Sequence, residues 1–205
     1  EQRSNKNRLT REIYNQLVKN QKSNPGNEFI TGSNAFIAFE GKIISSISYK
    51  QIDIFGPTIF DTSLTTNKDY EQLINKTHIH TRQKQIRNAL LFKVGDAVSP
   101  IILSDNERIL RNNKTIHEAK IIPSINKNDT NLVDLLVLTQ DGFPLQVGGQ
   151  LYDVTRGRID FNHNNIGGSG HQLINRLYYD ATSRKEQGYF GTYKIPNIKR
   201  TFINA

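Results

Sequence analysis

Two histidines separated by one residue, His78 and His80, are the side chains in this sequence that most resemble part of a metal site. If Ile79 lies in an extended segment, alternation puts both imidazoles on one side, where they supply two nitrogen ligands. The sequence places no third ligand beside them, and two solvated histidines before a helix are the commoner arrangement. The other histidines, His117, His163 and His171, fall at the ends of expected elements. No metal and no other cofactor is therefore predicted.

A glycine-rich segment, residues 167–170, has the backbone freedom found in phosphate-binding loops and nucleophile elbows. Gly168-Ser169-Gly170 lacks the G-x-S-x-G spacing of an elbow, and no lysine–serine pair follows it. The next segment alternates in polarity, so a tight hairpin is the better interpretation. Asp134 and Asp141 fall in a strand and in its exit turn, with no partner that indicates acid–base chemistry. The sequence predicts that the protein is not an enzyme.

Composition narrows the function classes further. The chain has 205 residues, a net charge of +8 and no cysteine, which excludes disulfide scaffolds, thiolate metal sites and cysteine nucleophiles. Basic residues are dispersed from Arg3 to Arg200 without a block of five or six, so no nucleic-acid partner is expected. No run approaches the roughly 20 apolar residues of a membrane-spanning helix, whereas strands of a membrane barrel alternate and escape that test.

The polarity pattern divides the chain into three parts. Residues 1–39 are predicted to be a polar extension with a short amphipathic helix, whose apolar positions are Leu9, Ile13 and Leu17. Residues 40–145 are predicted to form strand, helix, helix, strand and strand. Residues 146–205 change to the two-residue period of strands, after a short glycine-containing joint at 146–149.

In the middle part, each expected helix has a start signal. Thr81 is a good N-cap for the first helix, and Ser99-Pro100 starts the second, with Ser104-x-x-Glu107 as an alternative start one turn later. Strands are expected at 42–54, 119–125 and 132–139. The odd-numbered residues of the last strand are assigned to the core because Asp134 belongs to the even set. The predicted core is Ile43, Ile47, Leu90, Leu110, Val133, Leu135 and Val137.

The last part contains three alternating segments, at 155–162, 172–180 and 188–195. In the first of them, Thr155, Gly157, Ile159 and Phe161 share one face. A lipid-facing arginine is costly, so the alternation predicts that arginines face a polar barrel lumen while large apolar residues face lipid. The lumen set is Arg156, Arg158 and Arg176, and the lipid set is Ile159, Phe161 and Leu173.

The order and spacing of several motifs resemble the BamA/TamA superfamily of outer-membrane proteins, in the version found in Bacteroidetes. The segments similar to a POTRA domain are Gly41-Lys42-Ile43-Ile44-x-x-Ile47, Asp53-Ile54-Phe55-Gly56, Ile86-Arg87-Asn88-x-Leu90-Leu91-Phe92-Lys93-x-Gly95-Asp96, Glu107-Arg108-Ile109-Leu110-Arg111, Glu118-Ala119-Lys120-Ile121 and Val133-Asp134-Leu135-Leu136-Val137. The segments similar to the start of the barrel are Asn164-Asn165-Ile166-Gly167-Gly168-Ser169-Gly170, the turn joining the first two barrel strands, and Tyr193-x-x-Pro196-Asn197-Ile198.

This resemblance implies an α+β POTRA domain (β-α-α-β-β) in the periplasm, followed by antiparallel strands of an incomplete transmembrane β-barrel in the outer membrane. It implies a role in outer-membrane protein assembly, insertion or translocation, without any cofactor. The partners implied are unfolded outer-membrane or exported clients, outer-membrane lipid, and accessory lipoproteins or complex subunits. A dedicated two-partner-type exporter and a structural barrel subunit of a larger complex stay open as alternatives. About 55 residues after the joint supply only three or four strands, so the chain is expected to be a piece of a longer protein.

Two interaction surfaces are predicted. If the strand at 119–125 is outermost in its sheet, its main-chain groups can pair with an added client strand at Ala119, Lys120, Ile121 and Ile122. Lys120 and Pro123 instead fit an edge that is protected against aggregation, and both interpretations stay open. The resemblance further implies that the first barrel strand, with Thr155, Gly157, Ile159 and Phe161, forms one side of a lateral gate.

Overall fold

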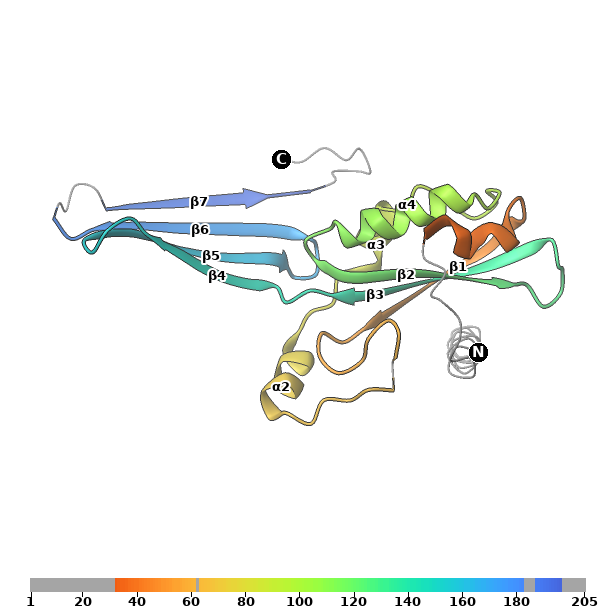
Figure 1. Cartoon of the computed structure of the whole chain (residues 1–205), viewed down its shortest axis with the longest axis horizontal. Coiled ribbons are helices and arrows are strands. Elements are labelled where there is room, and N and C mark those ends of the chain that lie inside the picture. The colour runs from red at the N-terminus through yellow and green to blue at the C-terminus, as the bar shows by residue number, and fades with distance from the viewer. Residues whose placement is uncertain (1–31, 62, 183–186, 197–205) are drawn as a thin grey trace.

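The computed structural model describes residues 32–61, 63–182 and 187–196, and the helix predicted around Leu9, Ile13 and Leu17 lies outside these residues. The described elements form two sheets, one of three strands and one of four (Figure 1). In chain order the elements are the 3₁₀ helix η1 (Gly32–Phe39), β1 (Ile43–Ile52), α2 (Asp69–Thr77), α3 (Gln83–Asn88), α4 (Pro100–Arg111), β2 (Ile116–Ile125), β3 (Leu132–Asp141), β4 (Leu145–Leu151), β5 (Arg156–Ile166), β6 (His171–Asp180) and β7 (Gly188–Lys194).

The three-stranded sheet has the order β1-β3-β2, with β1 parallel and β2 antiparallel to the central strand β3. Figure 1 shows η1, α3 and α4 on one face of this sheet, and α2 with the loop that precedes it on the other. The strands of the four-stranded sheet extend away from one end of the first sheet. Among the described residues, no helix is both long enough and apolar enough to cross a membrane.

Both predicted helices are present, and the residue at which each one starts tests its predicted N-cap. Ser99 occupies the N-cap position of α4 and Pro100 its first turn, so the earlier of the two proposed starts is confirmed. The helix α3 starts at Gln83, with Arg82 at the N-cap position. The prediction that Thr81 caps this helix is wrong, because Thr81 lies one residue before the N-cap position and its hydroxyl oxygen accepts from Asn165 Nδ2.

A β-bulge in β1 shifts the predicted core by one residue. The pairing with β3 slips between Ile44 and Ser46, so that Ile44 lies opposite Val133 and Ile47 opposite Leu135. The extra residue breaks strict alternation, and Ile44 becomes a buried core residue while Ile43 remains 40% exposed. The expectation for Ile43 was therefore wrong, because it assumed a regular strand. Ile47 packs against the core and is partly buried.

The remaining core predictions are confirmed, and the core is larger than expected. Leu90, Leu110 and the odd-numbered residues of β3, Val133, Leu135 and Val137, are buried under the helices. The even-numbered residues Leu136 and Leu138 are buried as well, in a second cluster with Ile52, Ile59 and Ile122. The segment between β1 and α3, which contains the unpredicted helix α2, lies on this second face (Figure 1). Asp134, which shares this face, is bonded by Ser46 Oγ at 2.6 Å and Asn126 Nδ2 at 2.9 Å.

The four-stranded sheet is antiparallel throughout, in the order β4-β5-β6-β7. Residues 146–149, predicted as a joint, belong instead to the strand β4, so the link between the two sheets is residues 142–144. The glycine-rich turn consequently joins the second and third strands of this sheet, and the predicted strand at 188–195 is its fourth. The expectation that this turn joins the first two strands was wrong, because β4 was not recognised as a strand.

Candidate functional site

The two sheets meet at residues that are close in space but distant in sequence. We call this region the joint, and it consists of the link 142–144, residues 81–82, Asp141 and the β5–β6 turn. The link follows directly from the last residue of β3. The main-chain N–H of Gly142 donates to Thr115 O at 2.9 Å, and Pro144 O accepts from Asn164 N at 2.8 Å. The ends of this three-residue link are thus fastened to β5 and to the turn before β2.

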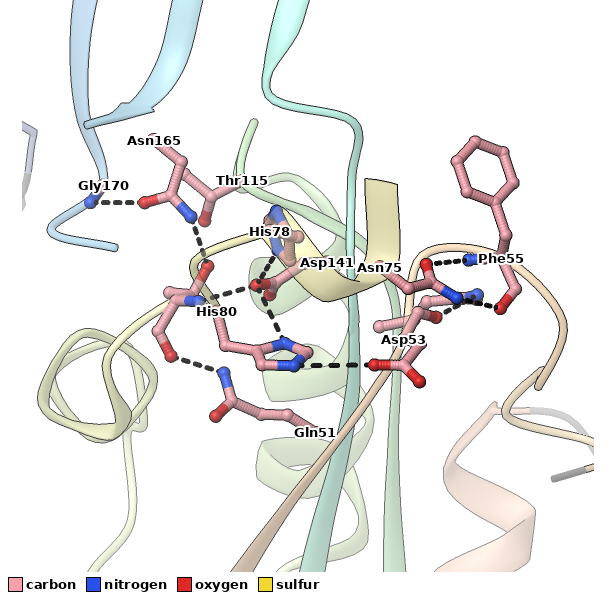
Figure 2. Close-up of polar contacts among 12 residues, drawn as sticks. Gln51, Asp53, Phe55, Asn75, His78, His80, Thr115, Asp141, Asn165 and Gly170 are labelled. Carbon is pink, nitrogen blue, oxygen red and sulfur yellow. Dashed lines mark hydrogen bonds and ion pairs between the residues drawn. The ribbon is translucent and has the colours of Figure 1, made fainter. Parts of the chain in front are cut away.

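The β5–β6 turn forms a second connection, because it is bonded to the segment before α3. Arg82 donates its main-chain N–H to Gly168 O at 2.8 Å and its Nε–H to Gly167 O at 3.1 Å. Asn165 is buried, donates from Nδ2 to Thr81 Oγ1 at 3.0 Å, and accepts from Gly170 N at 2.9 Å (Figure 2). The hairpin therefore bonds to a segment more than 80 residues earlier in the sequence.

Asp141 lies at the centre of the joint, with its side chain fully buried. Its Oδ2 accepts from His78 Nε2 at 2.9 Å and from Thr81 N at 2.6 Å (Figure 2). The carbonyl of Thr81 accepts from Gln51 Nε2 on β1. Burial raises the pKa of the Asp141 carboxyl, but the bonds from His78 and Thr81 and the nearby His80 ring outweigh burial and lower that pKa to about 2. Asp141 is therefore a buried carboxylate at neutral pH.

His80 also lies close to Asp141, on the side of the joint that solvent can reach. Its Nδ1 is 3.7 Å from Asp141 Oδ2, beyond hydrogen-bond range, and its Nε2 is 3.6 Å from Asp53 Oδ1. The interaction with the Asp141 carboxylate raises the pKa of His80, although burial acts in the opposite direction. In the part of the chain that the structure describes, His78, His80 and Asp141 form one group close enough to hold a metal ion. The two histidines were identified from their spacing, but the third member was not, because it lies 61 residues after His80.

Gly168 is expected to be the glycine on which the joint depends most. Both Gly167 and Gly168 have positive φ angles, of 57° and 73°, but their surroundings differ. A Cβ at Gly168 would collide with the main-chain oxygen of His80, whereas a Cβ at Gly167 would meet nothing closer than 3.9 Å. Gly167→Ala should cost only the backbone strain of about 1–2 kcal/mol, and Gly168→Ala should in addition separate the turn from residues 80–82.

Trypsin cleavage after Arg82, identified by mass spectrometry, measures this separation, because both the main chain and the side chain of Arg82 are bonded to the turn. We expect faster cleavage in Gly168→Ala than in Gly167→Ala. Equal cleavage rates in the two variants would show that the close approach at Gly168 does not hold the joint.

The register of the four-stranded sheet gives it one strongly apolar face. Residues opposite one another share a face, and Val147, Phe161, Ile159 and Leu177 are linked in this way across β4, β5 and β6. Nine large apolar residues on this face are at least one-third exposed: Leu145, Val147, Leu151, Ile159, Phe161, Leu177, Tyr179, Tyr189 and Tyr193. The polar Asn175 on the same face is bonded to Phe161 O at 3.0 Å and to the Tyr189 hydroxyl at 2.6 Å.

The opposite face of the four-stranded sheet is mainly polar and charged. Register places Arg156, Arg158 and Arg176 together on it, with Ile159, Phe161 and Leu173 on the other face, as the alternation predicts. Asp160 lies between two of the arginines, 3.2 Å from Arg158 Nε and 2.7 Å from Arg176 Nε. Three apolar residues, Ile174, Tyr178 and Phe190, interrupt this polar face.

The residues predicted to form a lateral gate lie in the interior of this sheet. Gly157, Ile159 and Phe161 belong to β5, which pairs with β4 on one side and β6 on the other, and Thr155 lies in the turn before it. An interior strand has its main-chain groups paired, so these residues do not form an edge of the described sheet, and their role at a lateral gate stays a prediction. We call the three-stranded sheet with its helices the α+β unit. The edge strand nearest this unit in sequence is β4, on which Val147 and Leu151 are exposed.

The strand β2, predicted as a docking edge, is an edge strand of its sheet. Two of its main-chain groups are bonded to α4: Ile121 N–H donates to Glu107 Oε1 at 2.8 Å, and Ala119 O accepts from Arg111 Nη1 at 2.9 Å. Burial raises the pKa of the Glu107 carboxyl. Neighbouring Lys120 lies 5.4 Å from the ring centroid of Phe60. An added strand must displace Glu107 and Arg111 to pair here, which favours the protected-edge interpretation at Ala119 and Ile121.

Comparison with known proteins finds a likeness in fold. No family model matches the sequence, and no curated protein matches it. Among solved structures, BamA from Haemophilus ducreyi lacking POTRA domains 1–3 is similar over 80% of the present chain and 26% of its own, with a TM-score of 0.55 and 11% identity. CdiB from Acinetobacter baumannii is similar over 77% of the present chain and 26% of its own, with a TM-score of 0.43 and 19% identity.

The chain thus spans about a quarter of the length of each of these structures. At 11% identity, the likeness to BamA concerns the fold. It establishes a shared fold over 80% of the present chain.

Proposed function

We propose that this chain forms the POTRA domain and the first four barrel strands of an outer-membrane protein of the BamA/TamA superfamily, which inserts or translocates other proteins. In this proposal the α+β unit lies in the periplasm and β4 to β7 lie in the outer membrane. The two edges of the four-stranded sheet pair with further strands of the barrel. The strand order β1-β3-β2 with α3 and α4 together on one face supports the POTRA assignment.

The observation that carries the proposal is the contrast between the two faces of the four-stranded sheet. One face exposes nine large apolar side chains, and the other carries three arginines around two acidic residues, Asp160 and Asp180. Fully burying one such apolar side chain is worth roughly 1.5–3 kcal/mol, so a face of this size is strongly favoured against lipid or another apolar surface. A barrel wall has this pattern, with apolar residues outward and polar residues toward a lumen.

The proposed mechanism uses strand pairing and needs no cofactor. A client arrives extended in the periplasm and pairs with a strand edge that becomes exposed when the barrel opens laterally, because main-chain groups bond largely without regard to sequence. The edge strand β4 is the candidate for one side of a lateral gate, since β5 is already paired on both sides. The client's own folding in the membrane supplies the free energy. The two charged side chains that occupy the β2 edge would regulate whether clients also dock there.

Single-cysteine labelling tests the orientation of the sheet, and the absence of native cysteine makes each variant clean. The neighbouring pair Arg158→Cys and Ile159→Cys lies on one strand and differs in face. In isolated outer membranes, a membrane-impermeant maleimide should label the first variant through the water-filled lumen and leave the second largely unlabelled. The variant Ile101→Cys, on the exposed surface of α4, is the fully labelled control. Equal labelling of the two β5 variants would contradict the proposal.

Depletion of the protein in cells distinguishes the roles within this class. Insertion predicts a broad loss of outer-membrane proteins, with clients accumulating in the periplasm. A dedicated exporter predicts the loss of one exported protein, and a structural subunit predicts the loss of one complex. We expect the broad loss, and an unchanged outer-membrane proteome after depletion would count against insertion.

A further inference from the structure

The cluster of His78, His80 and Asp141 at the joint has a geometry that its hydrogen bonds alone do not account for. His78 comes directly after α2, and His80 follows two residues later, so the extended backbone between them directs both rings to one side. The ring centroids are 5.2 Å apart and the rings are nearly perpendicular. Figure 2 shows both rings turned toward the Asp141 carboxylate, which comes from the end of β3.

The distances between the candidate ligand atoms are close to those around a tetrahedral ion. With metal–ligand bonds of about 2.0–2.2 Å, neighbouring ligand atoms in such a site lie roughly 3.4 Å apart. Asp141 Oδ2 is 2.9 Å from His78 Nε2 and 3.7 Å from His80 Nδ1, and all three ligand atoms lie within 4.8 Å of one another. Side-chain movements of up to about 1 Å would therefore bring the three atoms around one ion.

Two polar atoms in this cluster are buried and lack a partner. Neither Asp141 Oδ1 nor His80 Nδ1 has a hydrogen-bond partner among the residues that the structure describes. Buried polar groups almost always have a bonding partner, so two unpartnered atoms within one cluster indicate a site for a bound ion. The Asp141 side chain is fully buried and points into the cluster. The His78 side chain is almost fully buried, at 3% exposed.

The donor set selects the class of ion. Two imidazole nitrogens and one carboxylate oxygen suit zinc and its neighbours among the divalent transition metals, whereas calcium and magnesium take mainly oxygen ligands. His80 is 38% exposed, which leaves the cluster open to solvent for ion entry and for a water as fourth ligand. Asp53 lies behind His80, 3.6 Å from its Nε2, in the position of a carboxylate that orients a metal-bound histidine.

We propose that His78, His80 and Asp141 bind one divalent transition metal ion of the zinc type at the joint between the two sheets. The ion would connect the segment before α3 to the end of β3. The same segment holds the β5–β6 turn through Thr81 and Arg82, so the ion would fix the α+β unit against the four-stranded sheet. This site is independent of whether the sheet lies in a membrane.

Cobalt binding to the full-length protein, purified without a histidine tag and stripped with chelator, tests the site. We expect one Co²⁺ per chain, with visible absorption bands typical of a four-coordinate ion, displacement by Zn²⁺, and a Zn²⁺-dependent rise in Tm. His80→Gln should lower the affinity roughly 100-fold or more, because it removes a ligand. This variant keeps the bonds of Asp141 to His78 and Thr81, so it should still fold.

His117→Gln is the matched control, because His117 is an exposed histidine on β2 that does not belong to the group of candidate ligands. It should bind Co²⁺ and Zn²⁺ as the unmodified protein does. Absence of stoichiometric Co²⁺ binding in the unmodified protein would overturn the proposal and leave the cluster as a hydrogen-bonded contact alone. Equal binding by the His80→Gln variant would overturn it as well.

Discussion

Replacing Asp141 by alanine should lower the free energy of unfolding by about 3–5 kcal/mol, the range found when one partner of a buried, bonded charge is removed. The carboxylate is fully buried and accepts bonds from His78 Nε2 and Thr81 N. Alanine leaves both donors buried without an acceptor, and it removes the contact that fixes residues 78–81 to β3. Urea unfolding of the protein in chelator measures this effect without a contribution from bound metal.

Asp134→Ala is the control for this prediction, since Asp134 lies on the same strand but is only partly buried. Its bonds to Ser46 and Asn126 predict a loss of about 1 kcal/mol. An equal loss in both variants would contradict a special role for Asp141.

The same carboxylate predicts a dependence of stability on pH. The folded protein lowers the pKa of Asp141 from an ordinary value of 3.8 to about 2. A lowered pKa means that the carboxylate contributes its full stability above pH 4 and loses that stability as the pH falls toward 2. The difference in unfolding free energy between the unmodified protein and Asp141→Asn should therefore shrink over this interval. A difference that stays constant between pH 4 and pH 2 would show that ionisation of Asp141 does not contribute.

Leu110→Ala should cost about 2–5 kcal/mol, because the side chain is 0% exposed in the core between α4 and the sheet. The loss combines the transfer of the removed carbon atoms to water with the cavity that remains between helix and sheet. Urea titration with an unchanged slope would attribute the whole effect to stability. Ile101→Ala, on the same helix but 68% exposed, should change stability by less than about 0.5 kcal/mol. Similar losses for the two variants would contradict the assigned helix face.

The helix-side core was predictable from sequence because its signals are local. The apolar spacing on α4 identified Leu110, and alternation on β3 identified Val133, Leu135 and Val137. Alternation failed at Ile43, since a one-residue bulge cannot be seen in the pattern of a strand that contains several isoleucines. It was incomplete for β3, because burial of Leu136 and Leu138 depends on a segment from another part of the chain.

The joint was not predictable, because its members are distant in sequence and each has a local interpretation. Thr81 looks like a helix N-cap, Asp141 like a turn residue, and Gly168 like part of an ordinary hairpin. Only the fold brings them together, across 60 residues for Thr81 and Asp141 and 84 for Thr81 and Asn165. The edge of β2 shows the same limitation, since nothing in its own sequence reveals that Glu107 and Arg111 of α4 occupy its main-chain groups.

The two connections at the joint have a mechanical consequence. A link of three residues spans at most about 11 Å, so it acts as a short tether between β3 and the edge strand β4. The β5–β6 turn is a second point of attachment, on the neighbouring strands. With one point of attachment, the α+β unit could rotate in any direction relative to the four-stranded sheet. Two points of attachment restrict that rotation to a single hinge axis. Any swing of the helix-covered sheet about that axis transmits its torque to β4, an edge strand of the four-stranded sheet among the described residues.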